Sequence, residues 1–176
     1  MKTMMTLLTL AAIAISAGVA EAQELNLSAS RKITGQYYLP YSARTYSRHA
    51  VNQAQVLQYY GKNYATVPAE TAKAHAVEVR RNVDAFGKEL AKMETEYKND
   101  AEAMKLIAEI RLHHKQASEH CGMLEAECAK HAPQGGAVMS CCVDMLKHLQ
   151  AADAAHEKLL KYLKIPALPE ASQPTK

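Results

Sequence analysis

The chain of 176 residues has few of the residue types from which sheets and loop-rich folds are built. It contains no Trp, one Phe, seven Gly and six Pro. β-Sandwiches and barrels need many turns and strands enriched in aromatic residues, so this composition argues against them. Ala, Leu, Glu, Lys and Met are common instead, and these residues favour helices.

The chain also lacks a strong excess of charge and the common catalytic motifs. Its 21 Lys and Arg against 18 Asp and Glu give a formal net charge of +3, which excludes a strongly basic nucleic-acid binder and an acidic tail. It has no Cys-x-x-Cys-His, His-Glu-x-x-His, Gly-x-Ser-x-Gly or Gly-rich phosphate loop, and no Glu-x-x-His for a di-iron centre. We therefore expect neither an enzyme nor a partner of nucleic acids.

The first 22 residues have the pattern of a cleaved signal peptide. Lys2 precedes an apolar run over residues 4–19, and Ala20-Glu21-Ala22 fits a small-x-small cleavage site. The run is too short for a permanent membrane span, so none is expected in the mature chain. The sequence therefore predicts an exported protein that is periplasmic or secreted.

Helical periodicity predicts four helices, over about residues 42–60, 69–98, 101–131 and 138–164. Their connections are short, which favours antiparallel neighbours, so the predicted fold is all-α: an antiparallel up-down-up-down four-helix bundle over 42–164. Asn99-Asp100 is a breaker and a possible helix N-cap. An irregular Tyr-containing lead-in over 23–41 and a disordered, proline-rich tail over 165–176 are expected on either side.

The stripes expected to face the core carry metal-ligand side chains. The third helix offers Ala103, Ile107, Ile110, His114, Ala117, Cys121, Leu124, Cys128 and His131. The fourth offers Val138, Cys142, Met145, Leu149, Ala152, His156, Leu159 and Leu163, flanked by Cys141 and His148. The second offers His75, Val79, Asn82 or Val83, Phe86, Leu90 and Met93, and the first offers His49, Gln53, Val56 and Tyr60.

A rise of about 1.5 Å per residue, counted from the turn over 133–136, places these side chains at three heights. The first height, at roughly 6 to 9 Å, holds His75, Cys128, Cys141 and Cys142. The second, at roughly 16 to 18 Å, holds His49, Cys121, His120 and His148, with Met145 just above. The third, at roughly 27 to 30 Å, pairs His114 with His156. His113 and His131 are expected to be solvated, because the former sits beside the stripe and the latter near the turn.

Unpaired imidazoles and thiols in a core cost desolvation, whereas a soft metal ion turns such groups into satisfied ligands. Cys, Met and His together favour Cu(I), with zinc as the second choice. Chelating spacings on one helix support this reading, since Cys141 and Met145 are four residues apart and Met145 and His148 three. We therefore predict copper binding for sequestration or delivery, with metal ions as partners. The delivery partner is not identified, and a homo-oligomer is compatible with the sequence.

Other interpretations remain open at this stage. An exported protein with four cysteines is a candidate for disulfides, and Cys128 with Cys141 or Cys142 would join the third and fourth helices. The protein would then be a disulfide-stapled structural or interaction protein of the cell envelope without bound metal. A lone His on an apolar stripe is more often a hydrogen-bonded core residue than a ligand. A bundle holding noncovalent haem between a Met and a His is a third alternative.

The leader, the helix hairpins and the inward Cys, His and Met residues resemble bacterial periplasmic four-helix-bundle metal-binding proteins, of the copper-storage and small His-rich types. The resemblance covers about residues 42–164 and implies metal binding inside the bundle. The matching residues are His114, Cys121 and Cys128 at spacings of seven, Cys141 and His148 at seven, and Cys142 and His156 at fourteen. Four cysteines and eight histidines are fewer than such proteins carry, so we expect a few mixed-ligand sites instead of high-capacity storage.

Overall fold

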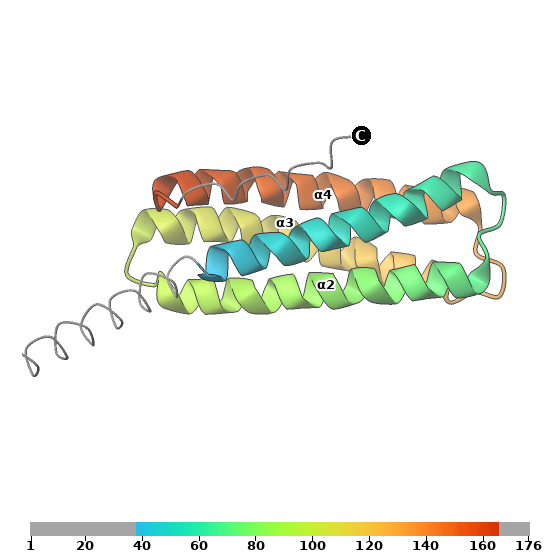
Figure 1. The fold of residues 1–176 in the computed structure, drawn as a ribbon, viewed down its shortest axis with the longest axis horizontal. Helices are drawn as coiled ribbons and strands as arrows, with labels where there is room; N and C mark the ends of the chain where they lie inside the picture. Colours follow the sequence, from blue (N-terminus) through green and yellow to red (C-terminus); the bar gives the residue numbers. More distant parts are fainter. Residues whose placement is uncertain (1–37, 166–176) are drawn as a thin grey trace, which may run out of the picture. The chain divides into compact units, whose positions relative to one another are not determined.

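The computed structural model describes residues 38–165, and these residues form four helices and no strand. The helices cover residues 38–63, α2 (Ala69–Glu96), α3 (Ala101–Cys128) and α4 (Gly135–Tyr162), and they lie side by side (Figure 1). The predicted all-α class and four-helix bundle are confirmed. The predicted signal peptide, residues 23–37 of the lead-in and residues 166–176 of the tail lie outside the described part.

Helix ends follow local chemistry, and several differ from the sequence prediction. Asp100 is the predicted N-cap of α3: its carboxylate accepts a hydrogen bond from the Ala103 N–H at 3.0 Å. Residues 38–41, predicted as irregular, are helical. Ile165, assigned to the disordered tail, is buried and donates its N–H to the Leu160 carbonyl at 2.9 Å.

The loop over residues 64–68 and the turn between α3 and α4 meet at one end of the bundle. The Val67 N–H donates to the Pro133 carbonyl and the Gly135 N–H to the Ala65 carbonyl, both at 2.9 Å. The carboxylate of Glu127, in the last turn of α3, accepts from the Gln134 N–H at 2.9 Å. The two connections therefore hold each other in place at the end of the bundle that contains the turn over 133–136.

Two glycines allow the first helix and α4 to come into backbone contact at this end. A Cβ atom on Gly61 would lie 2.6 Å from the Gly135 carbonyl oxygen and 2.8 Å from the Met139 nitrogen. A Cβ on Gly135 would lie 1.9 Å from the Tyr64 carbonyl oxygen. Only residues without a side chain permit this approach. Gly136, next in α4, faces open space.

The predicted stripes of the last three helices are confirmed in most positions. In α3 every stripe residue is buried except His114, which is half-buried, and His131, which is exposed. In α4 only Leu163 is not fully buried, and in α2 only His75. The buried apolar residues of these stripes belong to two clusters along the bundle, and Cys121, Cys128 and Cys142 lie in one of them.

The predicted stripe of the first helix is wrong by one residue, which is about 100° around the helix axis. The buried positions are Pro40, Ala43, Ser47, Ala50, Ala54, Leu57 and Gly61. His49 and Val56 are exposed, and Gln53 and Tyr60 are half-buried. The core face consists mostly of small residues, which bring the helix close to its neighbours and leave the larger side chains at the flanks.

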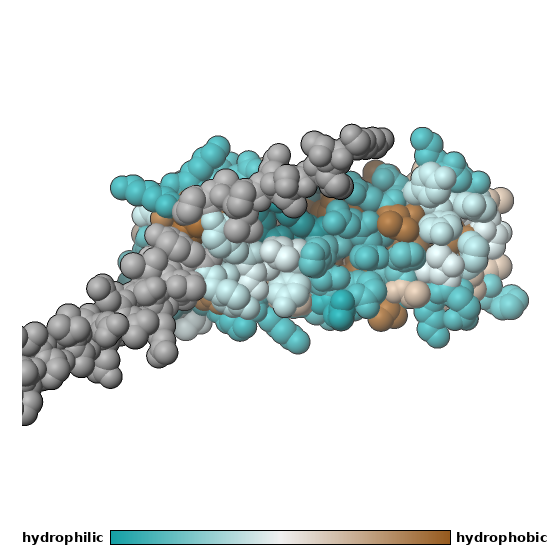
Figure 2. All heavy atoms as spheres, viewed as in Figure 1, coloured by the Kyte–Doolittle hydropathy of each residue, from teal (hydrophilic) through white to brown (hydrophobic). Residues whose placement is uncertain are grey.

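Ion pairs tie neighbouring helices together outside this core. The Arg44 guanidinium, on the first helix, donates to Asp153 of α4 at 2.6 and 3.0 Å. Arg111 of α3 pairs with both carboxylate oxygens of Glu94 of α2 at 2.8 and 2.9 Å. On the face drawn in Figure 2, hydrophilic residues predominate and hydrophobic ones occupy small separate areas. Within residues 38–165, no helix has the length and apolar character needed to cross a membrane.

Candidate metal centre

The four cysteines gather along the seam between α3 and α4. Cys121 and Cys128 lie on α3 two turns apart, and Cys141 and Cys142 lie in the first turns of α4. Cys121, Cys128 and Cys142 are 0 to 2% exposed, and Cys141 is half-buried. All four are free thiols. Three sulfurs thus face the core and the fourth stands at its edge, in the apolar cluster that also contains Met145.

The thiols influence one another's ionisation. Burial first, and then the neighbouring Cys128, Cys141 and Cys121, raise the pKa of Cys142 to about 12. Burial also raises the pKa of Cys128 to about 12 and that of Cys121 to about 11. The pKa of Cys141 is raised too, first by burial and then by Glu127. At neutral pH the cluster is therefore a set of protonated thiols, and in Cys128 and Cys142 the neighbouring thiols add to the effect of burial on the pKa.

His75, predicted beside the upper thiols, is held by its own hydrogen bond. Its Nδ1 donates to the side-chain oxygen of Gln53, on the first helix, at 2.7 Å. This bond leaves Nε2 as the ring nitrogen with a lone pair, which is the arrangement that metal-binding histidines use. The ring lies 6.4 Å from that of Tyr60.

The second predicted height is divided between separate places. Cys121 joins the thiols and Met145 is fully buried, but His49 is exposed on the first helix. His148 lies on the α3–α4 seam, where its ring is 5.5 Å from that of His120 and 6.1 Å from that of His113. The expectation that His113 is solvated is therefore wrong, because this ring is half-buried and stacked.

At the third predicted height, the rings of His114 and His156 both lie against the ring of Phe86. The ring centroid of Phe86 lies 5.2 Å from that of His114 and 6.3 Å from that of His156. His114 donates from Nε2 to the Val83 carbonyl at 2.9 Å, so it is a hydrogen-bonded boundary residue. Gly87 makes room for it, since a Cβ there would lie 2.7 Å from the His114 ring.

His156 is fully buried, and within residues 38–165 neither of its ring nitrogens has a hydrogen-bond partner of ordinary geometry. Burial lowers its pKa to about 4, and the positive charge of Arg44 acts in the same direction. The carboxylate of Asp153 and the carbonyl of Pro40 oppose that shift. His156 is therefore neutral at physiological pH and keeps lone-pair capacity inside the core.

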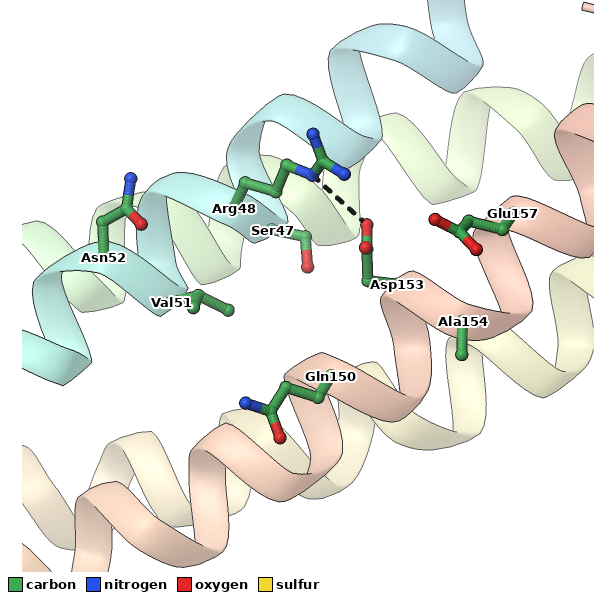
Figure 3. A pocket seen from close by; sticks show the side chains of 8 residues that line it. All are labelled: Ser47, Arg48, Val51, Asn52, Gln150, Asp153, Ala154 and Glu157. Carbon is green, nitrogen blue, oxygen red and sulfur yellow. Dashed lines mark ion pairs between the residues drawn. The ribbon is translucent and has the colours of Figure 1, made fainter. Parts of the chain in front are cut away.

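No three His, Cys, Asp or Glu side chains in residues 38–165 converge on a common point that would hold a metal ion. A polar hollow of about 450 Å³ lies elsewhere, between the first helix and α4 (Figure 3). Arg48 and Asp153 form an ion pair of 3.6 Å across it. Its lining includes none of the predicted ligands. The soft donor atoms are thus concentrated in the thiol cluster, and the imidazoles in separate groups.

Sequence reasoning placed His120 at the same height as His148, and their rings do lie 5.5 Å apart, but it missed His113 as a neighbour of His148. The signal was present, because His113 and His120 are seven residues apart and so share one face of α3. Comparisons with protein-family models, with curated proteins and with solved structures found no match to this chain.

Proposed function

We propose that this chain is an exported bundle that binds copper as Cu(I), with zinc as the second choice, for sequestration or delivery. The ligands are the thiolates of Cys121, Cys128, Cys141 and Cys142, supported by the thioether of Met145. The observation that carries the proposal is the cluster itself, with three buried free thiols and one half-buried thiol on two helices. The four cysteines set a low capacity.

The donor chemistry supports copper over harder metals. Thiolate and thioether sulfurs select Cu(I), whereas magnesium, calcium and manganese prefer oxygen ligands. Cu(I) is satisfied by two sulfurs, so it does not require three converging side chains. Cys128 and Cys142 form the pair we favour. Both are buried, and Cys128 raises the pKa of Cys142 more than the other two thiols do.

Protonation links this site to pH. Each thiol must lose its proton before it binds a metal, and the raised pKa values make that loss costly near neutrality. Affinity is therefore expected to rise with pH. Cys141, half-buried at the edge of the cluster, is the natural first contact for an entering ion.

The order of interhelical contacts supports the antiparallel up-down-up-down topology. Arg80 of α2 pairs with Glu125 of α3 at 2.7 Å, whereas the later Glu94 pairs with the earlier Arg111. Reversed order of this kind is expected of antiparallel neighbours. Such a topology brings the last turn of α3, which contains Cys128, beside the first turns of α4, which contain Cys142.

The test is an anaerobic Cu(I) titration of the reduced full chain against a competing chromophoric chelator. Cys128→Ala and Cys142→Ala are each expected to weaken the tightest site at least about tenfold. Met145→Leu, which keeps the volume and removes the sulfur, is compared with Met123→Leu, because Met123 is 59% exposed. Equal weak uptake by the parent and both alanine variants would refute the proposal.

Thiol counting on the untreated, denatured chain tests the alternative that the cysteines are a structural staple. Four reactive thiols are expected for a metal-binding cluster. Unreactive cysteines that become reactive only after reduction, together with no copper uptake, would favour the disulfide-stapled envelope protein.

A further inference from the structure

Three imidazoles form a row on the seam between α3 and α4, apart from the buried sulfurs. His113 and His120 come from α3, and His148, from α4, lies within ring-stacking distance of both. The ring planes are nearly parallel, with interplanar angles of 27° and 17°. All three side chains are half-buried and lie outside the two apolar clusters of the core.

Their spacing matches what a shared metal ion needs. With metal–nitrogen bonds of about 2.0 to 2.1 Å and a tetrahedral angle, two imidazoles on one ion have ring centroids about 5 Å apart. The His120 and His148 centroids are already 5.5 Å apart, and those of His113 and His148 are 6.1 Å apart. The stacked rings do not yet direct their nitrogens at one point, and rotation about the side-chain torsions would do so.

One ring nitrogen of this row is buried and unsatisfied within residues 38–165. The Nδ1 atom of His113 is buried and has no hydrogen-bond partner among the described residues. Such a group costs free energy unless a ligand or proton donor satisfies it. The charge of Asp144, one turn before His148, favours a cation here, whereas the charge of Lys147 opposes it.

We propose that His120 and His148, with His113 as a third ligand, form a second metal site that binds a divalent transition-metal ion such as Zn²⁺. Imidazole nitrogens suit zinc and other borderline divalent ions, in contrast to the sulfur cluster, which suits Cu(I). A coordinated ion would satisfy His113 Nδ1 or the nitrogens of its two neighbours. The site does not depend on the thiols, because none of its donors is a sulfur.

The test is a Zn²⁺ titration of the reduced full chain, followed by competition with a chelating dye and by ¹H–¹⁵N spectra of the imidazole rings. Zn²⁺ is expected to shift the ring signals of His120 and His148. His148→Ala is expected to weaken this site at least about tenfold. His120→Ala provides a second variant, and His131→Ala is the matched control, since His131 is exposed in the turn after α3. Circular dichroism verifies that each variant is folded.

The outcomes separate this site from the thiol cluster. Ring signals of the three histidines that stay unchanged at saturating Zn²⁺, or equal affinities for His148→Ala and His131→Ala, would overturn the histidine site. Zn²⁺ binding that is lost in Cys142→Ala but kept in His148→Ala would also overturn it, while leaving the copper proposal intact. Zn²⁺ binding lost in His148→Ala with no cysteine-dependent Cu(I) uptake would support the histidine site and refute the copper proposal.

Discussion

Replacing His156 with Leu is expected to remove most of the acid sensitivity that one buried imidazole gives to this bundle. In the folded chain the ring is fully buried, and its pKa falls from 6.5 to about 4, chiefly through burial. In the unfolded chain the ring takes up a proton near its ordinary pKa of about 6.5. Between these two values the unfolded state binds more protons than the native state, so stability is lost as the pH falls.

The size of the effect follows from the shift. Each pKa unit corresponds to about 1.4 kcal/mol of unfolding free energy. His156 therefore contributes about 3 kcal/mol of stability above pH 6.5, and this contribution is lost by pH 4. The free energy of unfolding of a domain this size is of the order of 10 kcal/mol, so the loss is measurable. At neutral pH, Leu also removes two unbonded ring nitrogens from the core. The difference in shape between Leu and the imidazole ring is expected to lower the free energy of unfolding by at most about 1.5 kcal/mol.

The assay is urea unfolding of the parent and His156→Leu, followed by circular dichroism at pH 7.5 and at pH 4.5. Other groups also destabilise the fold in acid, among them Asp153 and Glu127, whose pKa values are lowered. Their contributions are common to both proteins, so the informative quantity is the difference between the two pH-dependent losses. The parent is expected to lose about 2 to 3 kcal/mol more than the variant.

An equal loss of stability in the two proteins would refute the reasoning, because it would mean that the ring is protonated or hydrated in the native state. A direct check is the titration of the His156 ring signal by NMR. A midpoint near 6.5 in the folded protein would lead to the same conclusion.

Three further predictions concern close contacts and the thiols. Gly61→Ala is expected to lower the free energy of unfolding by about 1 to 3 kcal/mol in thermal or urea unfolding, since its Cβ would meet backbone atoms at 2.6 Å. Gly136→Ala is expected to change it by less than about 1 kcal/mol. Equal changes in the two variants would contradict this. Gly87→Ala is expected to displace the ring of His114 and cost about 1 to 3 kcal/mol, and an unshifted His114 ring signal in NMR would count against that contact. Cu(I) uptake at pH 7 is expected to release about one proton per thiolate bound, as measured in weakly buffered solution, and no release would mean that Cys142 and its neighbours are not the ligands.

The sequence was sufficient to predict the elements and much of the core. Low glycine, proline and aromatic content excluded sheet folds, and breakers such as Asp100 marked the helix ends. The stripes of α3 and α4 were predictable because they combine large apolar residues with a 3.6-residue period. The first helix defeated the same reasoning, because its buried face is lined mainly by Ala and Gly, whose small size gives little hydrophobic contrast.

By itself, then, the sequence determined an all-helical bundle whose inner faces carry sulfur and imidazole groups, because periodicity fixes where a side chain lies around its own helix axis. Only the tertiary structure decided which of these groups meet, since that depends on how far each helix is rotated and shifted against its neighbours. It placed Cys121 with the other thiols, His49 at the surface and His148 between His113 and His120. The close approach at Gly61 also required the folded chain, because backbone contact between two helices leaves no periodic signal along either of them.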